Sequence, residues 1–320
     1  MSRYVRVSIL GRKTPFSVDV NNGYTRAVDE MVKCLQNEID LVLPENPDLI
    51  VLPEACDRPV NLPVTERKKY FLERGTRILD FYRQIAKDNN CNIAYSTIRD
   101  VPDGTFRNST IMINRKGKID GIYNKNHIVD TENLRGDIYC GTGAPIINCD
   151  FGKVACAICF DLNFEPLRQK YEKLRPEMII FSSNYHGAIM QNYWAYSCRC
   201  YFVSAFGYGE STIVSPVGET IARSTNYFSY FTRTINLDYA IAHLDYNWGK
   251  LRNMKRKYGP GVCIHDPGHL GAVLITSEID GVSAMDMVKE FEIELLDDYF
   301  KRSLEFHERT RAEDFADVYS

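Results

Sequence analysis

The chain has 320 residues, of which 44% are hydrophobic and 25% are charged. This composition is ordinary for a globular protein with a large core, and it excludes disorder as the main state. The formal net charge of −3 gives no electrostatic attraction to nucleic acid, so we expect no nucleic-acid partner.

The N-terminus alternates apolar and polar residues like a strand and lacks the apolar stretch of a secretory signal. No apolar run approaches the length of a membrane-spanning helix. Ten cysteines without a signal peptide indicate a reducing compartment, where most thiols act as small core hydrophobes. We therefore expect a cytoplasmic protein with no membrane partner.

The first half of the chain is predicted to alternate strands and helices. Strands are indicated by alternating apolar residues or by short apolar runs between turn residues, and helices by an apolar face. The predicted strands are Val5–Ile9, Leu49–Leu52, Asn92–Arg99, Phe106–Asn114 and Lys118–Lys125. The predicted helices are one that follows a Thr25 cap and runs to Val42, and a single helix from Thr65 to Asp88.

The second half continues the alternation. Its predicted strands are Val154–Cys159, Met178–Ser183, Tyr201–Phe206, Ser211–Ser215, Glu219–Arg223 and Ser229–Asn236. Its predicted helices are Phe164–Leu174, Met190–Arg199 and Met285–Leu304, with Lys250–Lys257 as a solvated helix face and Tyr258–Gly271 as a loop. Because no linker-like stretch interrupts the pattern, we expect one α/β domain over residues 1–284. Residues 285–320 are expected to form a helix and a charged tail that pack on this domain or on a partner subunit.

Three predicted strands lead to residues with the chemistry of one nucleophilic site. Glu54 follows the strand at Leu49–Leu52, Lys125 ends a later strand, and Cys159 precedes a sharp turn into a helix. A thiolate is the reactive form of cysteine, and a carboxylate can take the thiol proton. A lysine can stabilise both the thiolate and the oxyanion that forms on attack. The three residues together indicate an acylating cysteine.

Three other chemistries are open to parts of this sequence: a zinc site, a redox pair and a metal-dependent phosphodiesterase. Cys156-x-x-Cys159 has the spacing of a zinc half-site or a redox pair, but Cys140 and Cys149 are badly spaced for a second ligand pair. Positions three apart along a strand also point to opposite faces. A metal-dependent phosphodiesterase would need clustered ligands, and the only dense candidates are His265, Asp266 and His269. A loop rich in glycine and proline accounts for these.

The three segments, in this order and spacing, resemble the nitrilase superfamily of carbon–nitrogen hydrolases. The segments Phe106–Thr110 and Tyr123–His127 are similar to the lysine-bearing hairpin of that family, and Gly209–Gly218 is similar to its late strand and turn. The resemblance covers roughly Val5 to Asn236. It implies a four-layer α-β-β-α sandwich, a homodimer or higher homo-oligomer, and catalysis without a cofactor or a metal ion.

The resemblance also implies the roles of individual residues. Glu54 would be the general base, Lys125 the oxyanion-stabilising cation and Cys159 the nucleophile, with the backbone N–H of Phe160 as a second oxyanion donor. Glu132, seven residues after Lys125, matches a second glutamate that orients the substrate and the lysine. His127 is assigned to structural hydrogen bonding.

Substrate-positioning residues are expected on loops beyond the strand ends. Tyr185 and His186 follow one strand, Phe160 flanks the nucleophile, and Asp57 and Arg58 follow the catalytic glutamate.

The sequence departs from the family pattern at two places. Asn163 occupies the position of an arginine after the nucleophile, and Trp194–Cys198 replaces a helix segment that commonly carries Arg and Glu. These differences put the transfer of any subfamily's substrate in doubt. We expect hydrolysis of a small linear amide or N-carbamoyl compound. A nitrile substrate, and a non-catalytic protein that binds a metabolite or a partner, remain alternatives.

Overall fold

The computed structural model describes residues 3–12 and 14–312. This part of the chain forms two compact units, one over Tyr4–Leu237 and the other from Asp238 onward together with Arg3. Each unit has a hydrophobic core of its own. All seven site residues predicted from the sequence lie in the first unit.

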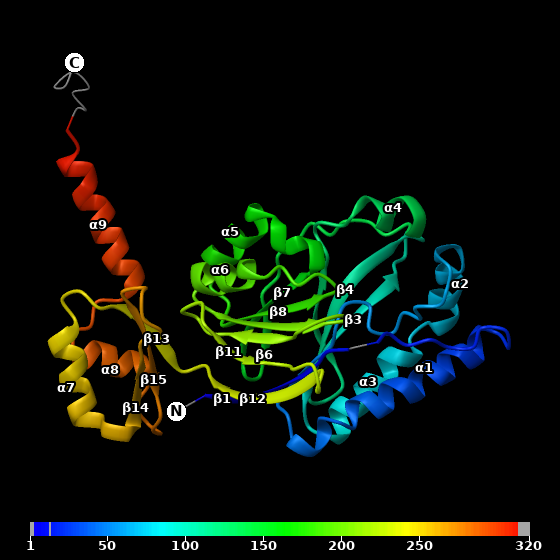
Figure 1. The fold of residues 1–320 in the computed structure, drawn as a ribbon, viewed down its shortest axis with the longest axis horizontal. Coiled ribbons are helices and arrows are strands. Elements are labelled where there is room, and N and C mark those ends of the chain that lie inside the picture. The colour runs from blue at the N-terminus through cyan, green and yellow to red at the C-terminus, as the bar shows by residue number, and fades with distance from the viewer. Residues whose placement is uncertain (1–2, 13, 313–320) are drawn as a thin grey trace. The chain divides into compact units, whose positions relative to one another are not determined.

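Within the described residues, the first unit is built on two six-stranded sheets (Figure 1). The first sheet has the order β12-β1-β2-β3-β4-β5, and the second has the order β11-β10-β9-β8-β7-β6. The first contains β1 (Tyr4–Leu10), β2 (Leu49–Val51), β3 (Asn92–Asp100), β4 (Phe106–Ile113), β5 (Ile119–Asn124) and β12 (Tyr230–Asn236). The second contains β6 (Ile147–Cys149), β7 (Gly152–Ile158), β8 (Met178–Ser183), β9 (Tyr201–Phe206), β10 (Thr212–Val214) and β11 (Thr220–Arg223).

The centre of each sheet is parallel and its margins are antiparallel. β1, β2 and β3 run parallel in the first sheet, as do β7, β8 and β9 in the second. Of these strands, β2, β8 and β9 are short, fully buried and largely apolar, as expected for strands covered on both faces. The carboxyl ends of such parallel strands are the usual place for a binding site.

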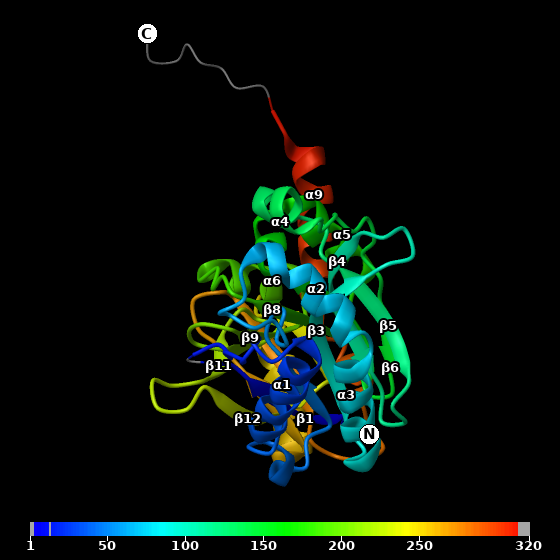
Figure 2. The same ribbon diagram turned by 90° about the vertical axis from the view of Figure 1, so that its right-hand side faces the viewer.

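Helices cover the outer face of each sheet. On the first sheet, α3 (Arg77–Asp88) packs on β3 and β4, and α1 (Tyr24–Ile39) packs on α3 (Figure 2). On the second, α6 (Ile189–Cys198) packs on β9 and β10, beside α5 (Glu165–Leu174). The inner faces meet where β1 and β2 contact β9 and where β4 contacts β7. This is the predicted four-layer α-β-β-α sandwich.

The helices near the N-terminus differ from the prediction in two ways. The single helix expected over Thr65–Asp88 is divided into α2 (Val64–Arg74) and α3, because Gly75 adopts φ +50° and ψ −127°, a backbone conformation that favours glycine and is strained for other residues. Thr25 does not cap α1, since it lies inside the helix and Gly23 is the N-cap.

Three short elements of this unit were not expected from the sequence: the 3₁₀ turn η1 (Leu43–Glu45), the helix α4 (Asp130–Gly136) and the strand β6.

The second unit has an antiparallel sheet of order β13-β15-β14. Its strands are β13 (Tyr239–His243), β14 (Val262–His265) and β15 (Ala272–Ser277), and its helical segments are α7 (Trp248–Tyr258), η3 (Gly259–Gly261), α8 (Ala284–Glu290) and α9 (Leu296–Thr310). The predicted solvated helix is α7. The prediction of a loop over residues 258–271 was wrong, because this segment contains β14. In β14 the apolar residues Val262 and Ile264 alternate with Cys263 and His265.

The C-terminal helix expected over Met285–Leu304 is two helices, since the chain leaves the helical conformation between Glu290 and Leu296. The predicted domain boundary after residue 284 falls at the start of α8 and stays a prediction. The charged tail beyond residue 312 lies outside the described residues.

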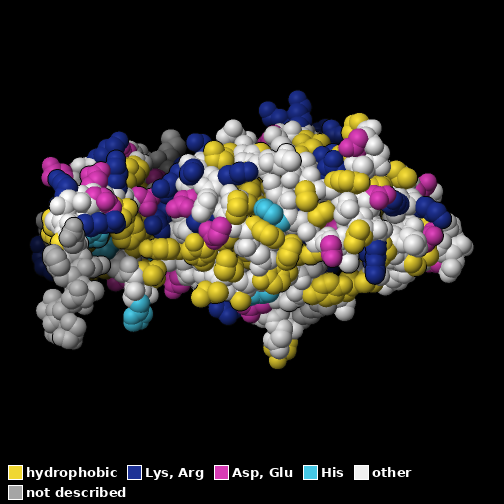
Figure 3. All heavy atoms as spheres, turned by 90° about the horizontal axis from the view of Figure 1, so that it is seen from above, with side chains coloured by type: hydrophobic (Ala, Val, Ile, Leu, Met, Phe, Trp, Pro, Cys, Tyr) yellow, Lys and Arg dark blue, Asp and Glu magenta, His cyan; other side chains and the backbone are white. Residues whose placement is uncertain are grey.

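The surface is mixed in character. On the face shown in Figure 3, basic and acidic side chains are interspersed with hydrophobic ones. In the part of the chain that the structure describes, no helix combines the length and the apolar character needed to cross a membrane.

Candidate active site

Glu54 lies on the loop that follows β2 and is only 8% exposed. Its Oε1 accepts hydrogen bonds from Asn108 Nδ2 at 2.8 Å and Lys125 Nζ at 3.1 Å. Its Oε2 accepts hydrogen bonds from the backbone N and the side-chain Nδ2 of Asn184, at 3.1 and 3.0 Å. Burial alone would raise the pKa of Glu54, but the charges of Lys125 and Arg58 and these hydrogen bonds lower it below its ordinary value. The carboxylate is therefore held in its charged, proton-accepting form.

Lys125 follows β5 and is almost fully buried, with 1% of its surface exposed. Its ammonium group lies between two carboxylates, 3.1 Å from Glu54 Oε1 and 2.7 Å from Glu132 Oε2. Burial opposes the charged form of Lys125, but the two carboxylates outweigh it and raise the pKa of Lys125 above its ordinary value. A permanent positive charge is thus fixed at this point.

Glu132 is presented by α4, and its two oxygens have different partners. Oε2 accepts hydrogen bonds from the Lys125 ammonium and from the backbone N–H of Val129, the latter at 3.0 Å. Val129 is the N-cap residue of α4. Oε1 accepts Asn108 Nδ2 at 3.0 Å, so one amide group of β4 binds both Glu54 and Glu132. The predicted pair of carboxylates around the lysine is present.

Cys159 follows β7 and opens the 3₁₀ turn η2 (Cys159–Asn163) with φ +50°. A positive φ is uncommon for a residue with a side chain, so surrounding contacts must impose it. Asp161, fully buried in this turn, accepts hydrogen bonds from the backbone N–H groups of Ile158 and His127 and from the Tyr123 hydroxyl. This anchored turn corresponds to the sharp turn expected after the nucleophile.

His127 has the structural role expected from the sequence. Its Nδ1 lies 2.9 Å from Asp161 Oδ1, and its ring stacks on Phe164 with a centroid separation of 4.0 Å. The imidazole therefore supports the Cys159 turn.

Burial and the negative charge of Glu54 raise the pKa of Cys159 to about 12, against the opposing effect of Lys125. The lysine therefore does not make the resting group a thiolate, and Cys159 is a neutral thiol at neutral pH. A neutral thiol attacks poorly, so its proton must be removed as the substrate reacts. Charged Glu54, whose electrostatic influence reaches the thiol, is the available base.

One cavity of about 350 Å³ joins these groups. Glu54, Lys125, Glu132 and Cys159 all line it. Its other walls come from the loop after β2, from α2, from the Ile98 region of β3 and from α4. The cavity is large enough for a small organic substrate and brings the nucleophile, the base and the cation to one space.

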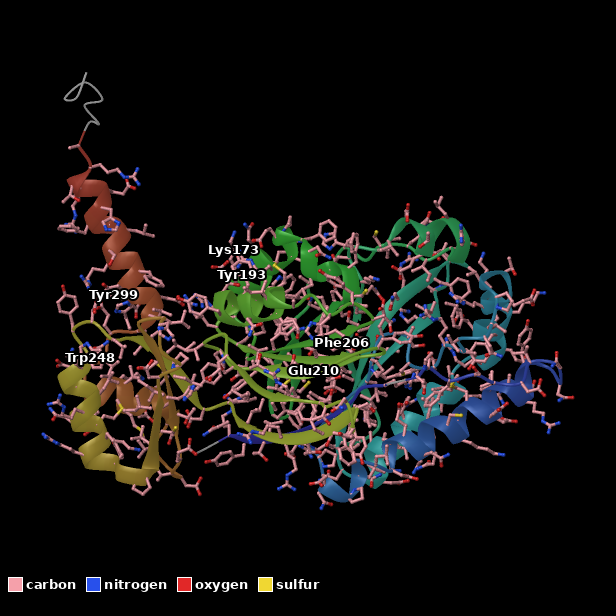
Figure 4. All side chains as sticks on the ribbon, viewed as in Figure 1. Lys173, Tyr193, Phe206, Glu210, Trp248 and Tyr299 are labelled. Atoms are coloured by element: carbon pink, nitrogen blue, oxygen red, sulfur yellow. The ribbon has the colours of Figure 1, made fainter. Side chains whose placement is uncertain are left out.

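The structure does not bring the other three predicted residues to this cavity. Phe160 packs edge-on against Phe164 at 5.2 Å. Tyr185 donates its hydroxyl proton to Asn163 Oδ1 at 3.2 Å, and the ring of His186 stacks on Phe206. Phe206 is the last residue of β9 and is labelled in Figure 4. None of the three lines the cavity, and their substrate-positioning roles stay predictions.

Of the two loop residues after Glu54, only Arg58 lines the cavity. Asp57 is fully buried and forms an ion pair of 2.7 Å with Arg74. Its role is to tie the loop to α2 rather than to contact a substrate.

Asn108 and Asn184 are site residues that the sequence reasoning missed. Asn184 directly follows β8, beside the strand that delivers Cys159, so the rule of parallel strand ends could have found it. Asn108 is a buried amide near the start of β4, followed by Ser109 and Thr110 before the strand becomes apolar. A buried amide indicates that the side chain forms hydrogen bonds, but the sequence does not indicate its partners.

The alternative chemistries gain no support from the geometry. All ten cysteines are free thiols, and Cys156 is fully buried among core residues. Across the described ranges 3–12 and 14–312, no three His, Cys, Asp or Glu side chains are grouped as metal ligands.

Comparisons with known proteins agree with the fold and show the family. A family model described as carbon-nitrogen hydrolase matches residues 17–242. The chain is 25% identical over 248 residues to the nitrilase and fragile histidine triad fusion protein NitFhit of Drosophila melanogaster, and the match covers 68% of this chain and 53% of that protein. It is 23% identical over 220 residues to omega-amidase NIT2 of Xenopus tropicalis, covering 60% of this chain and 77% of that protein. The chain thus spans about half the length of the fusion protein.

Among solved structures, the fold is similar to that of an amidase from Nesterenkonia sp. AN1, with a TM-score of 0.61. The match covers 80% of this chain and 97% of that one at 13% identity, so it shows a shared fold alone. That structure is of a mutant showing covalent addition of the acetamide moiety of fluoroacetamide at its active-site cysteine.

Proposed function

Because the chain belongs to the carbon–nitrogen hydrolase family, we propose that it hydrolyses a small linear amide or N-carbamoyl compound through a thioester on Cys159. The observation that carries the proposal is the cavity where the thiol meets a lysine ammonium held between two carboxylates.

In the first half of the reaction, Glu54 takes the Sγ proton of Cys159 as the sulfur attacks the carbonyl carbon. Negative charge develops on the carbonyl oxygen, where the fixed Lys125 ammonium stabilises it, with the backbone N–H of Phe160 as the second proposed donor. The C–N bond then breaks. Glu54 returns its proton to the leaving nitrogen, which departs as ammonia or an amine, and a thioester remains on the sulfur.

In the second half, a water molecule gives a proton to Glu54 and attacks the thioester carbon. The oxyanion forms again at the same place and is stabilised by the same charge. When the C–S bond breaks, Glu54 donates its proton to the sulfur, which restores the neutral thiol and releases a carboxylic acid. Glu54 thus alternates between base and acid, which a single carboxylate with a fixed position can do.

Two features support this assignment over a binding role without turnover. A scaffold has no evident need for a lysine buried between two carboxylates. Taking three charges out of water costs free energy, and catalysis gives a reason for that cost whereas a scaffold does not. The left-handed backbone of Cys159 is also a strained position of the kind that gathers at active sites.

The function is tested by screening simple amides, N-carbamoyl amino acids and nitriles with ammonia release as the readout. We expect turnover with amides or carbamoyl compounds and loss of at least about 1,000-fold in Cys159→Ala, with an unchanged circular dichroism spectrum. Turnover confined to nitriles would shift the assignment to a thioimidate route. Hydrolysis of none of the three classes, or full turnover by Cys159→Ala, would remove the proposal.

We also propose that the protein forms a homodimer or a higher homo-oligomer. The second-sheet helix α6 exposes large apolar side chains, with Ile189 at 76% and Tyr193 at 41%, which a partner could cover. Light scattering should give at least twice the monomer mass, and a monomer at micromolar concentration would contradict this.

A further inference from the structure

The active-site cavity contains more positive charge than its proposed chemistry uses. Besides Lys125, its lining includes Arg58, Arg67, Lys68 and Arg135, whereas the only acidic residues of the lining are Glu54 and Glu132. Both of these carboxylates bind Lys125. None of the other four cations of the lining forms an ion pair with Glu54 or Glu132.

Two of these cations have another explanation. Lys68 forms an ion pair with Asp137, just beyond α4. Arg135 lies on the exposed side of α4, where a basic residue in the last turn of a helix is favourable in itself. Neither needs a ligand.

Arg58 and Arg67 are different. Both are half-buried, and among residues 3–12 and 14–312 neither forms an ion pair with a carboxylate. Arg67 Nε donates to the carbonyl oxygen of Leu62 at 3.2 Å, which fixes the guanidinium. Burial and the like charge of Arg58 lower the pKa of Arg67 below its ordinary value. Two like charges have thus been placed close together, and an anion between them would relieve their repulsion.

The position of Arg58 and Arg67 in the cavity, together with the other residues of its wall, indicates which chemical groups a substrate carries. Arg58 and Arg67 also line a smaller recess of about 40 Å³ that adjoins Glu54 and Asn184, so they lie on the base side of the cavity. The rest of the lining includes an apolar wall of Val64, Phe71, Ile98, Val129 and Ile138. Guanidinium groups bind carboxylates through two parallel hydrogen bonds, and an apolar wall fits a short hydrocarbon chain.

We infer that Arg58 and Arg67 bind a carboxylate of the substrate, so the amide that this site takes is an acidic one, with a short aliphatic chain between its two ends. This inference rests on the proposed function. It adds two specificity-determining residues to the site, from the loop after β2 and from α2, neither of which takes part in proton transfer.

The test compares two probes of equal size, glutaramate and glutaramide, which carry a carboxylate and a neutral carboxamide at the far end. Wild-type enzyme should prefer glutaramate, per amide group, by at least about tenfold in kcat/KM. In the double variant Arg58→Gln/Arg67→Gln the ratio should fall by about 10- to 100-fold, chiefly through KM for glutaramate. Because any effect on the amide chemistry reaches both probes, the ratio isolates recognition of the acid.

Lys69→Gln is the matched control. This lysine is on α2 next to the cavity-lining residues, is exposed and does not line the cavity, and it is paired with Glu66. Lys69→Gln removes one positive charge from α2, the helix that carries Arg67, and should leave the glutaramate-to-glutaramide ratio of kcat/KM unchanged. Arg67→Lys keeps the charge without the planar fork and should retain part of the preference.

A second arm measures binding of glutarate by calorimetry, which needs no turnover. Glutarate should bind wild-type protein and Lys69→Gln, and bind the double variant at least about tenfold more weakly. Equal kcat/KM for the two probes, or a ratio that the double variant does not change, would overturn the inference while the amidase function stood. Absence of hydrolysis together with arginine-dependent binding would instead contradict the function alone, and absence of glutarate binding would overturn the anion site.

Discussion

Glu54 acts in the same sense on two ionisable groups of the cavity, Lys125 and Cys159. Its charge helps to keep the Lys125 ammonium protonated, and it also helps to keep the Cys159 thiol protonated. The free enzyme is therefore poised with a charged base beside a neutral thiol. Proton transfer between them is postponed until a substrate is present, which limits unwanted oxidation or alkylation of the sulfur.

This arrangement predicts opposite effects of one substitution. Glu54→Gln removes the base, so hydrolysis should fall by about 100- to 10,000-fold. The same change removes the negative charge that raises the pKa of Cys159 while Lys125 remains, so alkylation of Cys159 by iodoacetamide at pH 8 should become faster. Peptide mapping after timed labelling measures this. Slower alkylation in the variant would show that Glu54 does not govern the thiol.

Glu132 is predicted to act through Lys125 rather than on the thiol. Glu132→Gln leaves a hydrogen-bonding side chain but removes the closer of the two carboxylates at the ammonium, at 2.7 Å. We expect kcat to fall by about 10- to 100-fold with Cys159 alkylation retained. Steady-state kinetics and the same labelling assay decide the point, and unchanged kinetics would remove Glu132 from the site.

Lys125 is also predicted to stabilise the fold. Lys125→Met leaves Glu54 and Glu132 facing each other without a cation, and removing one partner from buried ion pairs typically costs about 3–5 kcal/mol. Urea unfolding should show this loss. The exposed control Lys69→Met should change the free energy of unfolding by less than about 1 kcal/mol. A loss in Lys125→Met no larger than in the control would contradict the geometry described here.

The residues that sequence reasoning placed correctly in the cavity are those that follow strands or match the family pattern. Glu54 and Cys159 follow parallel strands, where a short apolar run ends in a polar residue. The positions of Phe160, Tyr185 and His186 could not be judged in the same way. Which way a loop side chain turns depends on packing, such as the stacking of His186 on Phe206, that linear order does not contain.

At the scale of elements, the central strands of the first unit were predicted more reliably than helix boundaries, whereas β6 and the three strands of the second unit were missed. β8 and β9 match their predicted bounds, because buried parallel strands are uniform apolar runs. The division between α2 and α3 was missed, since the apolar pattern continues through it and only Gly75 marks the break. The helix α4 was missed because seven largely polar residues carry no apolar periodicity.

Gly75 gives a direct test at this scale. Gly75→Ala places a side chain where φ is +50° and ψ is −127°, and we expect a loss of about 1–3 kcal/mol in the free energy of unfolding. Gly249→Ala, in the first turn of α7 with no atom within 4 Å of the added carbon, is the control. It should be neutral or stabilising by up to about 1 kcal/mol. Equal effects of the two changes would refute the role of Gly75.

For the whole molecule, the pattern of strands and helices indicated only a mixed α/β protein. The four-layer arrangement depends on pairings that are distant in sequence, such as β1 with β12, and was available only through the family resemblance. Two face-to-face sheets and one twisted sheet have the same local signals. The fold was thus predictable from resemblance, whereas the separate unit from Asp238 onward was not.

Buried titratable groups set the pH range in which the molecule is stable. The pKa of Cys159 is raised to about 12, above the ordinary value of about 8.5. Its contribution to stability is therefore fully present below about pH 8.5 and is lost as the pH rises toward 12. Glu54, with a lowered pKa, contributes above its ordinary value of about 4.3, and that contribution is lost as the pH falls through the lowered pKa.

Urea unfolding between pH 7 and pH 10 should therefore show declining stability at the alkaline end. The decline should be shallower in Cys159→Ala, because this variant has no thiol at position 159 to ionise as the pH rises. Identical slopes in the two proteins would mean that Cys159 is not a buried, protonated thiol.

The central claim is that Cys159 carries the acyl group during turnover. The most direct measurement is intact mass spectrometry of enzyme quenched in acid during steady-state hydrolysis of its best substrate, followed by peptide mapping. The account predicts an added mass equal to the acyl group, on the peptide containing Cys159 and absent from Cys159→Ala. Acylation of a different residue, or steady turnover by Cys159→Ala, would contradict it.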